Sequence, residues 1–257
     1  MHNSPSTTLE LSGVTKRYGT RTVLANLDLV VPRGTIVGLV GPNGTGKSTA
    51  LKIAVGLIKP DAGRVTILGN AQPTIDARAS CAFVPDDPGG LDDLLVRDVL
   101  RLSAGLYGGG DERVLRSMQL LDALGLGGHT RTSMRALSHG SRRLVSLVVG
   151  LSAHTPFLVL DEATAALDPQ AVVLLRRALT AIANAGTGVL LASQSLDFAA
   201  KACDVVALLH EGGIVAMGSP SELLRVHGCE SLEDVFVALV LGEEMGSRVD
   251  ALLSADR

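Results

Sequence analysis

The sequence predicts an α/β fold in which a mostly parallel β-sheet is covered by helices on both faces. Short apolar segments alternate with longer amphipathic ones through the second half of the chain, and this alternation is typical of parallel sheets. Aromatic residues make up 2% of the 257 residues, whereas apolar residues make up 46%. The core is therefore built from Leu, Val, Ile and Ala, as is common where strands are buried on both faces.

The first ninety residues predict a small antiparallel sheet beside the beginning of the parallel one. Residues 9–14 and 22–31 are expected to pair as antiparallel strands. A helical pattern begins at Lys47 and fades by Leu57. Three further segments are predicted to be strands, because each is a short apolar run followed by a turn. They are residues 35–40, 64–68 and 81–84.

Residues 96–126 change to a helical period and predict an inserted helical subdomain at about 89–144. One expected face carries Leu95, Val99, Leu102 and Leu106. The glycines at 108–110 separate two helices, because glycine weakens a helix interior. A third helix is expected to begin near residues 138–141.

The rest of the chain alternates between strand and helix and returns to the core. Strands are expected at 157–160, 188–192, 205–210 and 214–217, and helices at 169–183 and 196–202. We predict one domain over 1–241, with its core at about 1–88 and 145–219. A mostly helical tail is expected over 220–257.

Residues 41–49 form a complete phosphate-binding motif, G-x-x-x-x-G-K-[ST], between a predicted strand and a predicted helix. Glycines let backbone N–H groups approach phosphate oxygens, and the positive end of the helix dipole faces the anion. Lys47 is expected to reach the β and γ phosphates, and Ser48 to bind Mg²⁺. The predicted ATP-binding residues here are Gly41, Pro42, Asn43, Gly44, Thr45, Gly46, Lys47, Ser48 and Thr49.

Two carboxylates follow the apolar segment 157–160. A buried parallel strand delivers such residues to its carboxyl end, where ligands of parallel sheets bind. Asp161 is expected to hold Mg²⁺, directly or through water. Glu162 is expected to orient the attacking water and accept its proton.

With these motifs in order, the sequence resembles the nucleotide-binding domains of the ATP-binding cassette (ABC) family over residues 8–241. The resemblance implies a P-loop NTPase (RecA-like) core with an antiparallel β subdomain and a helical subdomain. It also implies that Tyr18 stacks on adenine. Residues 137–141 match the signature L-S-G-G-Q, and 166–169 and 191–194 match two later motifs.

The family works as a head-to-tail dimer, which implies that the signature of one chain faces the ATP of the other. Ser138 and the Gly140 N–H would contact the γ-phosphate, and Asp168 would link the two sites. Residues 94–100 and 231–236 look like the ATPases of two-component exporters of drugs, lipids and polysaccharides. Such a subunit works with an integral membrane subunit and a second ABC subunit, at the cytoplasmic face of the membrane.

The sequence departs from the family pattern around the γ-phosphate. Asp86 stands where glutamine is usual, and it can still bind the metal through water. His139 replaces the first signature glycine and adds a side chain where the backbone approaches ATP. Ser141 replaces the signature glutamine. Gln194 replaces the switch histidine, so it can donate a hydrogen bond but cannot shuttle a proton.

The leading hypothesis is an ATP-binding exporter subunit that couples ATP binding and hydrolysis, fast or slow, to transport. The alternative is a regulatory or degenerate half of a heterodimer with little hydrolysis of its own. A member of the family that acts on ribosomes or DNA ranks lowest, because the net charge is −3 and the pI about 6.1. The cargo, the direction of transport and the choice between homodimer and heterodimer stay open.

Overall fold

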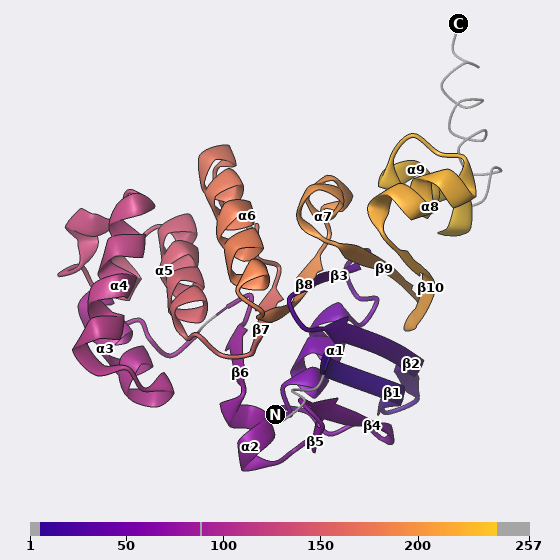
Figure 1. Ribbon diagram of the computed structural model, residues 1–257, viewed down its shortest axis with the longest axis horizontal. Helices are drawn as coiled ribbons and strands as arrows, with labels where there is room; N and C mark the ends of the chain where they lie inside the picture. The colour runs from indigo at the N-terminus through magenta and orange to yellow at the C-terminus, as the bar shows by residue number, and fades with distance from the viewer. Residues whose placement is uncertain (1–5, 88, 241–257) are drawn as a thin grey trace, which may run out of the picture.

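The computed structural model describes residues 6–87 and 89–240 of the chain. Figure 1 shows three parts: an antiparallel sheet, a central sheet with helices, and a helical block at one side. The strands are β1 (Thr7–Tyr18), β2 (Arg21–Pro32), β3 (Ile36–Val40), β4 (Ala62–Ile67), β5 (Asn70–Ala71), β6 (Cys81–Val84), β7 (Phe157–Asp161), β8 (Gly188–Ser193), β9 (Val205–His210) and β10 (Gly213–Gly218).

The α-helices are α1 (Lys47–Ala54), α2 (Ile75–Ala79), α3 (Val96–Tyr107), α4 (Gly110–Ala123), α5 (His139–Ser152), α6 (Pro169–Asn184), α7 (Leu196–Ala202), α8 (Pro220–His227) and α9 (Leu232–Val240). Two short 3₁₀ turns, Gly127–His129 and Met134–Ala136, lie between α4 and α5. Helix α5 therefore continues through residue 145. The sequence had predicted that the helical subdomain ends at residue 144 and that the core resumes at residue 145.

The central sheet has six strands in the order β10-β9-β3-β8-β7-β6, and only the β10–β9 pair is antiparallel. The second sheet has the order β2-β1-β4-β5 and is antiparallel throughout. The predicted α/β class, with a mostly parallel sheet and a separate antiparallel one, is confirmed. Because β6, β7, β8 and β3 run in the same direction, their carboxyl ends meet at one edge.

Both faces of the central sheet are buried, because successive side chains point to opposite faces. Val37 and Leu39 pack towards α1 and the antiparallel sheet. Ile36 and Val40 pack on the other side, with residues of the helices α5, α6 and α7. This double burial requires apolar residues at consecutive positions, which explains the uninterrupted apolar segments in the sequence.

Helix α3 is amphipathic, but its buried face differs from the predicted one. The buried residues are Val96, Val99, Leu100, Ser103 and Ala104. Leu102 and Leu106 were expected on the same face as Val99, yet both are exposed. The prediction was wrong because the leucines fit a spacing of about 3.5 residues, which defines one helix face. The face that packs against the core is a neighbouring one that begins at Val96.

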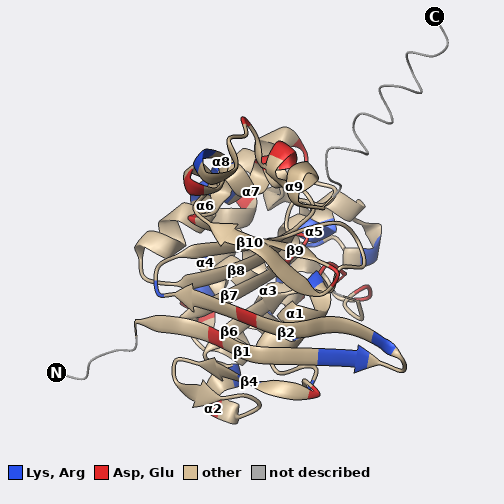
Figure 2. Cartoon of the chain, turned by 90° about the vertical axis from the view of Figure 1, so that its right-hand side faces the viewer, with Lys and Arg blue, Asp and Glu red and all other residues tan. Residues whose placement is uncertain are grey.

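The described tail consists of α8 and α9. Helix α8 has Ser219 as its N-cap and Pro220 in its first turn, and it ends at Gly228 in a left-handed conformation. The predicted tail beyond residue 240 lies outside the described residues. No helix within the described ranges is long and apolar enough to cross a bilayer. Lys and Arg are interspersed with Asp and Glu over the face in Figure 2.

Candidate nucleotide-binding site

The phosphate loop lies between β3 and α1, at the carboxyl edge of the central sheet. A Cβ on Gly41 would lie 2.2 Å from the carbonyl oxygen of Leu209, so only glycine fits beside β9. Gly46 has φ of +109°, a conformation that side chains disfavour. The loop is thus held tightly against its neighbouring strands while its N–H groups and the beginning of α1 stay available to an anion.

Lys47 is buried, and its ammonium closes the loop on itself. The Nζ atom donates to the carbonyl oxygens of Gly41 at 2.7 Å and Pro42 at 3.0 Å. It also lies 3.4 Å from Oε1 of Glu162, as an ion pair. The positive charge therefore already stands between the loop and the predicted base, where phosphate oxygens would meet it.

Ser48 and Asp161, which are both predicted to bind Mg²⁺, lie together. The Ser48 hydroxyl donates to Oδ1 of Asp161 at 3.1 Å. Burial raises the pKa of Asp161, with smaller contributions from Glu162 and Asp86 that raise it and from Ser48 and Lys52 that lower it. A buried carboxylate whose charge is poorly compensated is a favourable ligand for a cation.

The oxygen atoms of Ser48 and Asp161 are the type that Mg²⁺ prefers. Within the described ranges, no group of three or more His, Cys, Asp or Glu side chains is arranged to hold a metal ion. A Mg²⁺ bound here would therefore complete its coordination with phosphate oxygens and water, as Mg²⁺ commonly does. The two residues fit that role.

Glu162 and Gln194 are joined by hydrogen bonds. The Gln194 backbone N–H donates to Oε2 of Glu162, and its Nε2 donates to Oε1, both at 3.3 Å. Glu162 has φ of +48°, which is unusual for a residue with a side chain and is typical of functional sites. Lys47 and Gln194 thus hold the Glu162 carboxylate from two sides.

Tyr18 lies at the end of β1 and is 49% exposed. The ammonium of Lys16 lies 5.6 Å from its ring centroid. Opposite Tyr18 on β2 stands Arg21, whose guanidinium donates to the Gly44 carbonyl oxygen at 3.2 Å. Sequence reasoning missed Arg21, which ties the hairpin of Tyr18 to the phosphate loop. Its proximity to Gly44 depends on a sheet register that no motif encodes.

Asp86 follows β6 at the same edge, but its side chain is exposed. No hydrogen bond of its carboxylate to Ser48 or Asp161 is present in the described part of the chain. The backbone carbonyls of Asp86 and Asp161 both accept from the Arg143 guanidinium, and the nearby charge of Asp86 contributes to raising the pKa of Asp161. The predicted metal role of Asp86 stays a prediction that requires a bridging water.

The signature residues begin α5. Ser138 is its N-cap, and the Ser138 hydroxyl oxygen accepts from the Ser141 N–H at 3.1 Å. A Cβ on Gly140 would lie 2.5 Å from the Ala166 carbonyl oxygen, so this glycine lets the helix pack against that loop. Asp168 caps α6 by accepting from the Ala171 N–H at 2.8 Å. The expected role of Asp168 between two chains stays a prediction.

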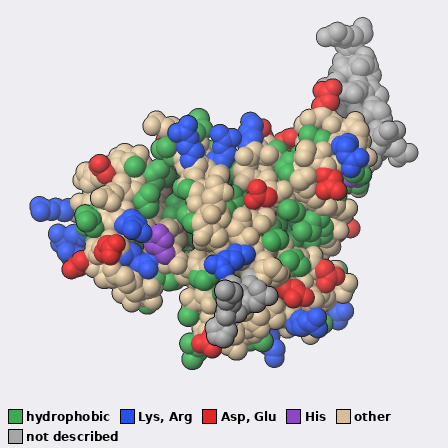
Figure 3. All heavy atoms as spheres, viewed as in Figure 1, with side chains coloured by type: hydrophobic (Ala, Val, Ile, Leu, Met, Phe, Trp, Pro, Cys, Tyr) green, Lys and Arg blue, Asp and Glu red, His purple; other side chains and the backbone are tan. Residues whose placement is uncertain are grey.

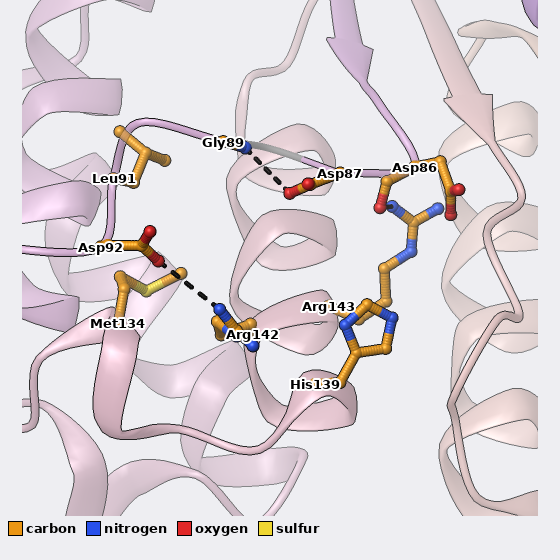
Figure 4. Close-up of a pocket in the computed structure, with 9 residues that line it drawn as sticks. All are labelled: Asp86, Asp87, Gly89, Leu91, Asp92, Met134, His139, Arg142 and Arg143. Carbon is orange, nitrogen blue, oxygen red and sulfur yellow. Dashed lines mark hydrogen bonds and ion pairs between the residues drawn. The ribbon is translucent and has the colours of Figure 1, made fainter.

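A pocket of about 200 Å³ separates the signature helix from the loop after β6 (Figure 4). Its lining includes Asp86, Asp92, His139, Arg142 and Arg143. The structure thus brings two of the departures from the family pattern, Asp86 and His139, to one pocket. Arg142 forms an ion pair at 3.5 Å from Asp92, whereas Arg143 contacts backbone carbonyls.

Comparisons with known proteins agree with this geometry. A family model described as "ABC transporter" matches residues 24–165. A "Nod factor export ATP-binding protein I" of Ralstonia nicotianae is 33% identical over 229 residues, which cover 88% of this chain and 71% of the relative. The chain belongs to the ABC transporter family.

Further relatives of this ABC subunit point the same way. The "Daunorubicin/doxorubicin resistance ATP-binding protein DrrA" of Streptomyces peucetius is 31% identical over 249 residues, which cover 90% of this chain and 74% of the relative. A solved structure titled "Structure of ATP binding subunit of ABC transporter" matches with a TM-score of 0.84 and 30% identity, over 90% of this chain and 99% of that one. The chain is an ATP-binding subunit of an ABC transporter.

Proposed function

We propose that this ABC subunit hydrolyses Mg-ATP and drives export through a separate membrane subunit. The observation that carries the proposal is the cluster around Glu162. Its carboxylate lies 3.4 Å from Lys47 and accepts two hydrogen bonds from Gln194 at 3.3 Å. A carboxylate fixed beside a phosphate-binding lysine is placed to orient a water molecule and take its proton.

Each residue of the site is proposed to have a separate role that follows from its chemistry. Lys47 and the N–H groups of the loop bind and orient the phosphates, and Ser48 and Asp161 would hold Mg²⁺, which offsets phosphate charge when bound. Glu162 holds the proton at its carboxylate oxygens. The Nε2 group of Gln194 carries a second N–H that can reach the γ-phosphate. Because Gln194 lacks a titratable ring, we expect slower turnover than with histidine at this position.

Export is the direction that the relatives support, since they include a Nod factor export protein and a daunorubicin resistance protein. We therefore place this subunit with exporters and at the cytoplasmic side of a membrane, where ATP is available. The alternative, a regulatory half with little hydrolysis, is motivated by Asp86, His139 and Gln194. The relatives do not favour it.

The proposal is tested by phosphate release from Mg-ATP with the purified chain, the Glu162→Gln variant and the exposed control Glu233→Gln. We expect release from the wild type and from the control. In Glu162→Gln, release is expected to fall by a factor on the order of 10²–10⁴, the contribution of a general base. Tight ATP binding without release by the wild type, alone and with its membrane subunit, would instead establish the regulatory alternative.

We propose further that two ABC subunits complete each site, with Ser138 and Gly140 of one facing the phosphates of the other. Ser138 and His139 are exposed at the beginning of α5, where N–H groups and the helix dipole favour an anion. Mixing Lys47→Met chains with Ser138→Arg chains tests this arrangement. Each is expected to be inactive alone, whereas the mixture regains activity from one intact composite site. A mixture as inactive as its components would argue against the dimer.

The membrane subunit is proposed to dock at an open groove of about 630 Å³ between α2 and the helical block. Ile75 and Leu106 line it and are 85% and 75% exposed, which is unusual for large apolar side chains. Ile75→Glu and Leu106→Glu should reduce retention on membranes that contain the partner while leaving ATP binding intact. Val226→Glu on α8 is the control. Unchanged retention in both groove variants would exclude this surface.

A further inference from the structure

Arg143 is a buried cation that makes no ion pair with any residue in the described part of the chain. It lies in the first turns of α5 and is 2% exposed. Its guanidinium donates to the carbonyl oxygens of Pro85, Asp86 and Asp161, with the Asp86 contact at 3.1 Å. In Figure 4 its side chain extends from α5 to the loop of Asp86.

Placing this guanidinium here costs free energy, because a buried charge loses its hydration. Burial accordingly lowers the pKa of Arg143, while the carboxylates of Asp86, Asp161 and Glu162 act in the opposite direction. An apolar side chain would fill the same volume without that cost. What Arg143 adds is a connection between three chain segments: the signature helix, the loop after β6 and the end of β7.

The contact at β7 is the one that bears on catalysis. The Asp161 carbonyl belongs to the peptide that leads directly into Glu162, which has the unusual φ of +48°. A shift of this peptide when Mg-ATP binds would move the Arg143 guanidinium, whose Nη2 donates to the Asp161 carbonyl oxygen and whose Nη1 donates to that of Asp86. The planar guanidinium has its donors in a rigid fork, so the two ends cannot move independently.

The other end of α5 lies at the proposed docking groove. Arg113 of α4 donates to the Ser152 carbonyl oxygen in the last turn of α5, and also lines that groove. A 14-residue helix spans about 21 Å at 1.5 Å per residue. A displacement at Arg143 is thus carried along a rigid element towards Ala153 and His154, which line the groove as well.

We propose that Arg143 is a positioning residue that transmits the state of the nucleotide site to residues 86–92 and, through α5, to the docking groove. The inference rests on the proposed function in that Mg-ATP must bind at Lys47 and Asp161. It assigns no contact between Arg143 and ATP. Removing it should therefore uncouple the loop while leaving ATP affinity within about twofold.

Hydrogen exchange of the full chain, with and without Mg-ATP, tests the proposal. In the wild type we expect ATP to change exchange both at 161–167 and at 86–92. In Arg143→Lys and Arg143→Met, the change at 161–167 should persist and the change at 86–92 should fall at least fivefold. Arg142→Lys is the matched control, because Arg142 is the neighbouring arginine and pairs only with Asp92 in the described residues.

A loop response in both Arg143 variants equal to that of the wild type would overturn the proposal, as would a wild type that binds ATP without any loop response. A wild type that fails to bind Mg-ATP would remove the proposed function first, and this inference with it. If a variant unfolds, Arg143→Ala with added methylguanidinium provides a second measurement. Return of the loop response with methylguanidinium is expected, and a refolded chain that stays unresponsive would contradict the proposal.

Discussion

The phosphate-loop half of the site and the signature half differ in how much of their geometry is set within one chain. In the first half, Lys47, Glu162 and Gln194 are joined by an ion pair and hydrogen bonds. In the second half, Ser138 is exposed and its hydroxyl is occupied with Ser141, three residues along the same helix. One half is therefore organised within a single chain, whereas the other is an exposed surface that, under our proposal, faces the ATP of a second subunit.

The difference follows from where the residues lie. The first half gathers at the carboxyl ends of neighbouring parallel strands, so burial of the sheet fixes its positions. The second half begins a helix whose position depends on the Gly140 contact with Ala166 and on the carbonyl contacts of Arg143. Substitutions in the first half should therefore change ATP binding by the separate chain. Substitutions in the second half should leave that binding unchanged and alter association between chains, together with the hydrolysis that depends on association.

The largest effect is expected from Lys47→Met, which removes the ammonium between the loop and Glu162. ATP affinity should fall about 10–100-fold, as for a lost hydrogen bond to a charged group, and hydrolysis by a further 10²–10³-fold. Equilibrium binding of labelled ATP to the chain at low concentration measures the change in ATP affinity. Lys59→Met, an exposed lysine outside the loop, is the control. Unchanged affinity would show that the first half is not preorganised by Lys47.

Gln194→Ala tests whether the first half separates binding from chemistry. Loss of both the Glu162 contact and the spare amide donor should lower hydrolysis about 10²-fold, since removal of one preorganised donor has this magnitude. ATP affinity should stay within about threefold, because in the described structure Gln194 makes hydrogen bonds to Glu162 and none to the loop. Steady-state phosphate release and ATP binding are compared with Gln119→Ala on α4. Equal losses in both quantities would place Gln194 in binding instead.

His139→Gly and His139→Ala test the second half. Removing the ring and then the Cβ should strengthen ATP-dependent association about 3–10-fold, because the backbone can approach a phosphate more closely. Binding of ATP by the separate chain should not change. The association is measured by sedimentation in the presence of Mg-ATP, with every chain also carrying Glu162→Gln. Weaker association in both variants would mean that the imidazole itself supports the contact.

The smallest effect concerns the charge of Asp161 in the chain without nucleotide. Its pKa is raised in the folded state, so its ionisation costs stability as pH rises from 3.8, the ordinary pKa of aspartate, through the raised folded pKa. Asp161→Asn should therefore raise the thermal midpoint at neutral pH by a few degrees, where ~1 kcal/mol corresponds to ~2–4 °C in chains of this size. The gain should vanish below about pH 3.8 and when Mg-ATP is added to the wild type. A lower midpoint at pH 7 would show that the hydrogen bond to Ser48 outweighs burial.

The α/β class and its strands could be predicted from the sequence because burial on two faces requires uninterrupted apolar segments. Residues 157–160 were expected as a strand, and β7 occupies Phe157–Asp161. The stripe of α3 could not be predicted, because its leucines fit more than one face. Only packing against α4 and α5 selected Val96 and Leu100 for burial and left Leu106 exposed.

The sequence by itself predicted which residues gather at the candidate nucleotide site, since Lys47, Ser48, Asp161 and Glu162 belong to motifs whose spacing follows from a strand and a helix. Only the tertiary structure decided what Arg143 and Arg21 contact. Both side chains donate to carbonyl oxygens of segments that are distant along the chain. Arg143 donates to Pro85 and Asp161, and Arg21 donates to Gly44. A backbone carbonyl is present at every residue, so the sequence holds no signal for such a partner until folding selects one.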